Sequence, residues 1–155
     1  MGLKEELKLV KPLATLEHEA LLNIYYTAAM MKKKAVDSLS PFGLTDVQLN
    51  LLMMMRHQGG TKGLSQARLG NLMAVGRANV TGLVDRLERD GLVKRTDTKD
   101  RRFNIIQLTD KGCKLLDKIE PQYAREVHRL MSSFTKQELK EMVRLLEAAR
   151  KRFSE

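Results

Sequence analysis

Residues 79–112 read NVTGLVDRLERDGLVKRTDTKDRRFNIIQLTDKG, and this stretch joins a helical pattern to two short apolar segments across a strongly basic turn. Its first part carries apolar residues at three- and four-residue steps, namely Val80, Leu83, Val84 and Leu87. This spacing predicts an amphipathic helix, which Gly91 is well suited to end. The runs "LVKRT" and "FNIIQL" flank the polar segment "DTKDRR" and predict a β-hairpin with that segment at its tip.

The residues before this stretch predict two more short helices. Thr45 and Gln48 have the spacing of a capping box, which places one helix at about residues 46–57, before "HQGGTKG". The run "LSQARLGNLM" predicts the next helix, with Ser65 as its N-cap, and "AVG" forms a short turn before the helix that ends at Gly91. Two short helices across a tight turn, followed by a basic hairpin, form a winged helix-turn-helix, whose second helix enters the DNA major groove.

Longer helical patterns lie on both sides of this region. Apolar residues recur with helical spacing over residues 13–38, and that helix should end before "SPFG". Another helix should start at Thr109, and Pro121 should kink or break it. Thr135 and Glu138 form a second capping-box pattern before a final amphipathic helix.

Together these patterns predict a mainly α protein with a small β-hairpin. The winged helix-turn-helix DNA-binding lobe should occupy residues 45–110. The N- and C-terminal helices, residues 10–40 and 111–155, carry more apolar side chains at helical spacing than one small lobe can cover. This excess predicts that they are dimerisation helices. The 155 residues then form a single domain.

The charge of the chain indicates a polyanionic partner. The net charge is +9, and residues 61–102 carry ten Lys or Arg and five acidic residues, whereas residues 1–60 are almost neutral. An isolated basic run is often only a solvated turn, but here it directly follows a helix-turn-helix pattern. We therefore expect double-stranded DNA to bind this region.

Several other classes of protein have little support in the sequence. No N-terminal apolar segment and no run near 18 apolar residues is present, which predicts a cytoplasmic protein without a membrane partner. Cys113 is the only cysteine and the three histidines are far apart, which predicts neither a metal site nor a cofactor. A Gly-rich phosphate loop and a G-x-S-x-G elbow are both missing, so we expect no enzymatic activity.

The stretch 79–112 resembles the signature of the MarR (multiple antibiotic resistance regulator) family: a recognition helix of the form VTxLVDRLExxGLVxR, a wing with D-x-R, and then LTxxG. The six-helix layout of that family also resembles this chain from about residue 10 onward. The resemblance implies a transcription factor, typically a repressor, that binds a palindromic operator as a homodimer. It further implies release from DNA by a small lipophilic or phenolic effector, or by oxidation of a cysteine.

The predicted DNA contacts lie on the second and third elements of the lobe and on the wing. In the recognition helix, arginine can pair with guanine and asparagine with adenine, although either can contact phosphate instead. Gly82 replaces a frequent arginine of the family, which removes one possible contact. Asp100 and Arg102 match the D-x-R pattern, in which the arginine reaches the minor groove. The full set of candidates is Ser65, Gln66, Arg77, Asn79, Thr81, Gly82, Arg86, Arg95, Lys99, Asp100, Arg101 and Arg102.

Two interpretations stay open for several of these residues. Arg86 and Arg89 can clamp phosphates or pair with acids one turn away, and Arg95 can contact phosphate or cover a strand edge. Methionine and tyrosine side chains form the core in most proteins, but they can also line an adaptable effector pocket. The candidates for such a pocket are Tyr25, Tyr26, Met30, Met53, Met54 and His57.

Two other functions compete with sequence-specific regulation. A non-specific architectural nucleic-acid binder would share the charge but show little preference for one DNA sequence. A helical protein-interaction module would need no DNA, and binding that persists at high salt would favour it.

Overall fold

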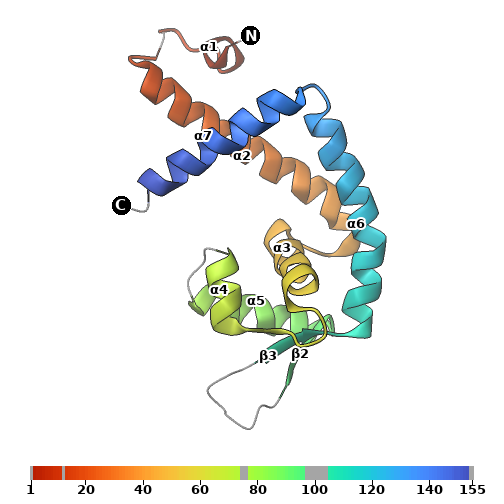
Figure 1. Ribbon diagram of the computed structural model, residues 1–155. Helices are drawn as coiled ribbons and strands as arrows, with labels where there is room; N and C mark the ends of the chain where they lie inside the picture. The colour runs from red at the N-terminus through yellow and green to blue at the C-terminus, as the bar shows by residue number, and fades with distance from the viewer. Residues whose placement is uncertain (1, 12, 74–76, 97–104, 154–155) are drawn as a thin grey trace. The chain divides into compact units, whose positions relative to one another are not determined.

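The computed structural model describes residues 2–11, 13–73, 77–96 and 105–153. The chain divides into two compact units, Met1–Thr109 and Asp110–Glu155. The first unit contains most of the helices and a small antiparallel sheet, and the second contains two helices (Figure 1). The mainly α fold class predicted from the sequence is therefore confirmed.

The first unit begins with two helices. A single turn, α1 (Leu3–Glu6), was not expected from the sequence. The long helix α2 (Leu16–Leu39) begins after Thr15, whose hydroxyl accepts a hydrogen bond from the His18 amide at 3.2 Å. This cap places the start of the helix three residues later than predicted. A 3-10 turn at Ser40–Phe42 follows, so the helix ends before "SPFG" as expected.

The predicted capping box at Thr45 forms. In α3 (Asp46–Met54) the Gln48 amide donates to Thr45 Oγ1 at 3.2 Å, and the Thr45 amide donates to Gln48 Oε1 at 2.9 Å. These bonds satisfy two of the amides that a helix start leaves without partners. The α-helix is shorter than predicted, because a π-helical turn, η2 (Met55–Gly59), replaces its last turn.

The next segment combines a strand and a helix. Strand β1 (Leu64–Ser65) leads directly into α4 (Gln66–Met73), and Ser65 Oγ accepts the Arg68 amide at 3.2 Å, as the predicted N-cap requires. Strand β1 was not predicted. It pairs antiparallel with β3, with Leu64 opposite Ile106, so the hairpin becomes a three-stranded sheet of order β1-β3-β2.

The helix α5 (Arg77–Arg89) ends in a glycine cap. The Gly91 amide donates to Glu88 O at 2.9 Å and the Leu92 amide to Leu87 O at 2.8 Å, while Gly91 has φ 71°. This pair of bonds is the Schellman motif, which needs a left-handed residue and therefore favours glycine. The predicted end of the recognition helix at Gly91 is confirmed.

The hairpin strands are β2 (Val93–Thr96) and β3 (Ile105–Leu108). They pair antiparallel with Val93 opposite Leu108 and Arg95 opposite Ile106. At the base of the hairpin, Thr109 Oγ1 donates to Gly91 O at 2.6 Å and the Thr109 amide donates to Leu92 O at 3.1 Å. The sheet is thereby tied to the end of α5.

The core of the first unit lies where α3, α4 and α5 meet the sheet. Helix α4 contacts α3 and α5, and α5 contacts β2. Val80, Val84 and Leu87 of α5 are fully buried, as the sequence predicts, whereas Leu83, predicted for the same face, is half-buried. The fully buried side chains of this unit are Leu51, Leu52, Met55, Leu69, Val80, Val84, Leu87, Val93 and Ile106.

The second unit consists of α6 (Asp110–Met131) and α7 (Lys136–Arg152). Helix α6 continues through Pro121, so of the two predicted effects of this proline the break does not occur, and the kink stays a prediction. Pro121 has no amide hydrogen to donate to the preceding turn, but its neighbours in sequence keep their helical backbone on both sides. The predicted capping box of α7 forms, since Thr135 Oγ1 accepts the Glu138 amide at 3.3 Å and the Thr135 amide donates back to Glu138 at 2.7 Å.

Among the helices that the structure describes, none combines the length and the apolar character that crossing a membrane requires.

Candidate nucleic-acid interface

The start of α4 and the first turns of α5 are joined by a side-chain hydrogen bond. Gln66, the first residue of α4, donates from Nε2 to Thr81 Oγ1 of α5 at 3.2 Å. Ser65 is occupied as the N-cap of α4, so its hydroxyl has a structural partner. Three candidates from the sequence therefore lie together at the helix-turn-helix, with Thr81 held by Gln66.

The outer face of α5 is open to solvent. Asn79, Thr81 and Arg86 are exposed. At Gly82, an added Cβ would meet no atom within 4 Å, which shows that the helix surface is free there. Because Val80, Val84 and Leu87 on the opposite face are fully buried, α5 presents one polar surface while the core holds its position. Such a surface has the size and chemistry to enter a DNA groove.

Arg95 of β2 reaches back to α5 rather than into solvent. Its guanidinium forms ion pairs with Asp85 and Glu88, and its amide donates to Glu88 Oε1 at 2.9 Å. Burial acts to lower the pKa of Arg95, but the hydrogen bonds and charges of the two carboxylates outweigh it and raise the pKa above its ordinary value. Asp85 and Glu88 of the helix are thus paired with a residue of the strand.

The remaining candidates fall partly outside the described residues. The backbone of Arg77 begins α5, but its side chain is not described, and the wing residues Lys99, Asp100, Arg101 and Arg102 lie in the segment 97–104, which is also outside the description. Their proposed contacts with DNA stay predictions. Lys94, in the described part of the hairpin, is exposed.

The candidate effector residues come from three elements of the first unit. Tyr25, Tyr26 and Met30 are exposed on α2, and the two tyrosine rings contact edge to face with centroids 5.7 Å apart. Met53 and Met54 are half-buried on α3, whereas His57 is exposed in η2. An effector site in these residues also stays a prediction.

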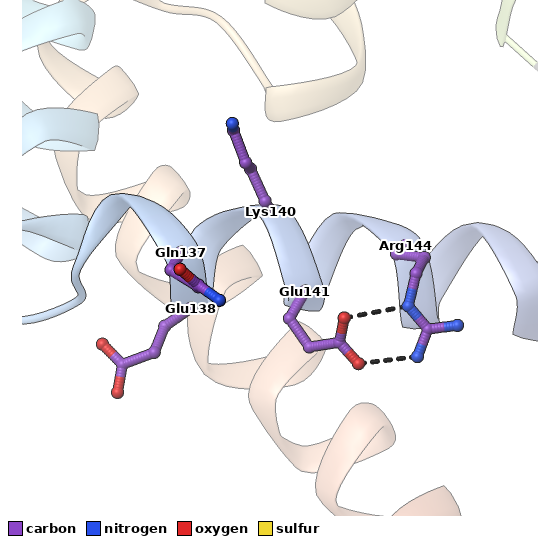
Figure 2. A pocket seen from close by; sticks show the side chains of 5 residues that line it. All are labelled: Gln137, Glu138, Lys140, Glu141 and Arg144. Carbon is purple, nitrogen blue, oxygen red and sulfur yellow. Dashed lines mark hydrogen bonds and ion pairs between the residues drawn. The ribbon is translucent and has the colours of Figure 1, made fainter.

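Figure 2 shows a different pocket, on the second unit. Its lining comes entirely from α7 and consists of Gln137, Glu138, Lys140, Glu141 and Arg144. Glu141 accepts two hydrogen bonds from the Arg144 guanidinium, at 2.8 and 2.6 Å, which lower the pKa of Glu141. Ligand pockets are usually concave and mostly apolar, so this charged helix surface is a poor candidate for a lipophilic effector. Across the described residues, no group of three His, Cys, Asp or Glu side chains could hold a metal ion.

Two features of the site were missed in the sequence. The bond between Gln66 and Thr81 spans 15 residues, and no local pattern indicates it. The pairing of Arg95 had a weak signal: Asp85 and Glu88 lie three residues apart on one helix face, and a cation follows in the next strand. The contact of α5 with β2 is needed to bring them together.

Comparisons with known proteins agree with this geometry. A family model described as "MarR family" matches residues 42–102. YkoM of Bacillus subtilis, described as an uncharacterized HTH-type transcriptional regulator, is 32% identical over 138 residues, which cover 86% of this chain and 88% of YkoM.

Two solved structures show the same fold. The S. aureus MepR–DNA complex has a TM-score of 0.77 and 25% identity, covering 90% of this chain and 98% of that one. CouR from Rhodococcus jostii RHA1, bound to p-coumaroyl-CoA, has a TM-score of 0.76 and 25% identity, covering 88% and 95%. The buried and open faces of α5, the small sheet behind it and the likeness to YkoM along most of both chains lead to one conclusion: this chain is a transcriptional regulator of the MarR family.

Proposed function

We propose that this chain binds a palindromic DNA operator as a homodimer in the cytoplasm and represses transcription until a small lipophilic or phenolic effector releases it. The observation that carries the DNA-binding part is the open face of α5, where Asn79, Thr81 and Arg86 are exposed while the opposite face packs into the core. The net positive charge of residues 61–102 favours the DNA backbone as the partner. MepR, a protein of the same fold, has been solved with DNA.

The proposed contacts divide into two kinds. Arg77, Asn79 and Thr81 read base edges in the major groove, with Gln66 orienting Thr81, and Gly82 leaves room for the helix to approach the bases. Arg86 contacts a phosphate next to that groove. In the wing, Arg102 enters the minor groove with Asp100 beside it, and Lys99 and Arg101 contact phosphates.

The homodimer is supported by apolar side chains that a single chain leaves uncovered. Large hydrophobic residues are exposed on α2, α6 and α7, and monomeric proteins rarely keep so many in the open. A second copy would cover them in a self-complementary interface. Examples from the three helices are Leu21, Ile24, Met31, Tyr123, Val127, Val143 and Leu145.

Selection of bound sequences from a random duplex pool tests this proposal. A two-fold dimer should select a palindrome whose half-sites are centred about 34–36 Å apart, or one helical turn. Light scattering of the free protein at micromolar concentration should give the mass of two chains. A recovered pool without any consensus would instead indicate the non-specific architectural binder, and a monomer would contradict the homodimer.

The effector part of the proposal has its own test. CouR has been solved with p-coumaroyl-CoA, which supports a ligand site in this fold. We expect phenolic or lipophilic compounds to lower the affinity for the selected operator by roughly 5- to 150-fold, the usual range of coupling between two sites. Tyr25, Tyr26, Met30, Met53, Met54 and His57 are the proposed contacts. Fluorescence anisotropy of the labelled operator against a compound panel measures the effect, and a panel in which no compound changes the affinity would argue against effector release.

A further inference from the structure

We propose that Arg95 is a positioning residue, which fixes the base of the wing against the recognition helix and does not itself bind DNA. This inference rests on the proposed function, because it assigns a role within the DNA-binding site. It replaces the interpretation, made from the sequence, that Arg95 contacts a DNA phosphate. The relevant groups are Arg95 on β2 and the two carboxylates of Asp85 and Glu88 on α5, which we call the Arg95 cluster.

The Arg95 cluster links strand and helix through both the side chain and the backbone. The guanidinium donates through one terminal nitrogen to Asp85 and through the other to Glu88. The amide of Arg95 donates to Glu88 Oε1 at 2.9 Å. Asp85 and Glu88 are three residues apart, so they share one face of α5. Two carboxylates on one face of the helix thus bind the same residue of the strand.

The position of Arg95 in the sheet explains why its amide is available. In the sheet order β1-β3-β2, strand β2 lies at an edge, and its outward amides have no strand to pair with. At Arg95, the Glu88 carboxylate accepts the amide hydrogen bond that the carbonyl of a further strand would otherwise accept. Because Arg95 lies opposite the fully buried Ile106, a fixed Arg95 also fixes the register of the hairpin. The wing segment begins two residues later, at residue 97.

The charges of the Arg95 cluster also argue against a phosphate contact. One cation and two carboxylates leave a net charge of −1, which does not attract a polyanion. The Arg95 side chain is 29% exposed, and both terminal nitrogens of its guanidinium are already engaged by carboxylates. Without Arg95, two unpaired carboxylates would remain on the recognition helix. Its role is therefore to hold and neutralise them.

Exchanging the charges of Asp85 on the helix and Arg95 on the strand tests whether Arg95 positions the wing or contacts DNA. The variants are Arg95→Gln, Arg95→Asp, and the double variant Asp85→Arg with Arg95→Asp, which restores an opposite-charge pair with the cation on the helix. Arg86→Gln is the matched control, because Arg86 is an exposed arginine of α5 that we assign to phosphate. Each variant is titrated with salt on the selected operator, and hydrogen exchange of the residue 95 amide is measured in the free protein.

We expect Arg95→Asp to weaken operator binding about tenfold or more, and the charge exchange to recover most of this loss, since coupled charges are strongly non-additive. The salt slope should stay near the wild-type value in Arg95→Gln and fall by about 0.9 in Arg86→Gln. Exchange of the residue 95 amide should accelerate in Arg95→Gln, because its carboxylate partner is no longer held by the guanidinium.

Two results would overturn the proposal. One is a charge-exchanged protein that binds as weakly as Arg95→Asp, and the other is an Arg95→Gln slope that falls as much as that of Arg86→Gln. If the wild-type protein selects no operator, the proposed function fails, but the exchange of the residue 95 amide in the free protein still tests whether the cluster holds β2.

Discussion

Gly63→Ala should destabilise the protein by about 3 kcal/mol or more, the largest effect we expect from a single methyl group. Gly63 has φ 75°, where an L-residue with a side chain costs about 1–2 kcal/mol. A Cβ at this position would lie 2.3 Å from Ile106 O, a backbone atom of the central strand that cannot move without disturbing the sheet. At this chain length, the melting temperature should fall by about 6–12 °C in a calorimetric or circular dichroism scan.

Two other glycines are matched controls for this effect. Gly43 also has a positive φ, of 66°, in the left-handed region, but a Cβ there meets nothing within 4 Å, so Gly43→Ala should cost only about 1–2 kcal/mol for the backbone strain. Gly82 lies inside α5 with equally open space, and Gly82→Ala should stabilise the protein by about 0.5–1 kcal/mol. Equal losses of stability at Gly63 and Gly43 would show that the close approach to β3 contributes nothing.

Leu87→Ala should cost about 2–5 kcal/mol of unfolding free energy, the range for removing a fully buried leucine side chain. Leu87 is on the buried face of α5, and its carbonyl accepts the Leu92 amide in the glycine cap. Operator binding should therefore weaken only as far as the folded fraction falls. Urea unfolding, with operator affinity measured at a temperature where the variant is folded, separates the two quantities.

Arg86→Gln, one residue earlier, is the opposite case. Arg86 is exposed, so the substitution should change stability by less than about 0.5 kcal/mol while it weakens binding to operator and random duplex alike. The two faces of α5 would be assigned incorrectly if Leu87→Ala kept the wild-type melting temperature. The same would follow if Arg86→Gln melted well below the wild-type protein.

Features that depend on neighbouring residues in the chain could be predicted from the sequence. The capping boxes at Thr45 and Thr135 and the end of α5 at Gly91 all formed as expected. Each is decided within about four residues, by a side chain that satisfies a free amide or by a glycine that tolerates a positive φ. Local chemistry was sufficient for these elements.

Features that depend on packing between distant segments could not be predicted in the same way. Strand β1 has two residues, too few for any pattern, and it exists because Leu64 pairs with Ile106 across the sheet. The bonds of Gln66 to Thr81 and of Arg95 to α5 arise only once the helices and strands have packed. Pro121 shows the reverse case, since the break that a local rule allows at proline is outweighed by the rest of α6. The DNA contacts of the wing, at Arg102 above all, stay predictions.

The carboxylate of Glu88 on the edge amide of β2 has a consequence for self-association. A free sheet edge is a template on which strands of other molecules can add, and this is a common start of aggregation and domain swapping. Here an incoming strand would have to displace a charged group from the Arg95 amide. At the other edge of the described sheet, β1 offers only two residues to a new strand. The hairpin that we propose to contact DNA is thus protected, at both edges of the described sheet, against the addition of strands from other copies of the protein.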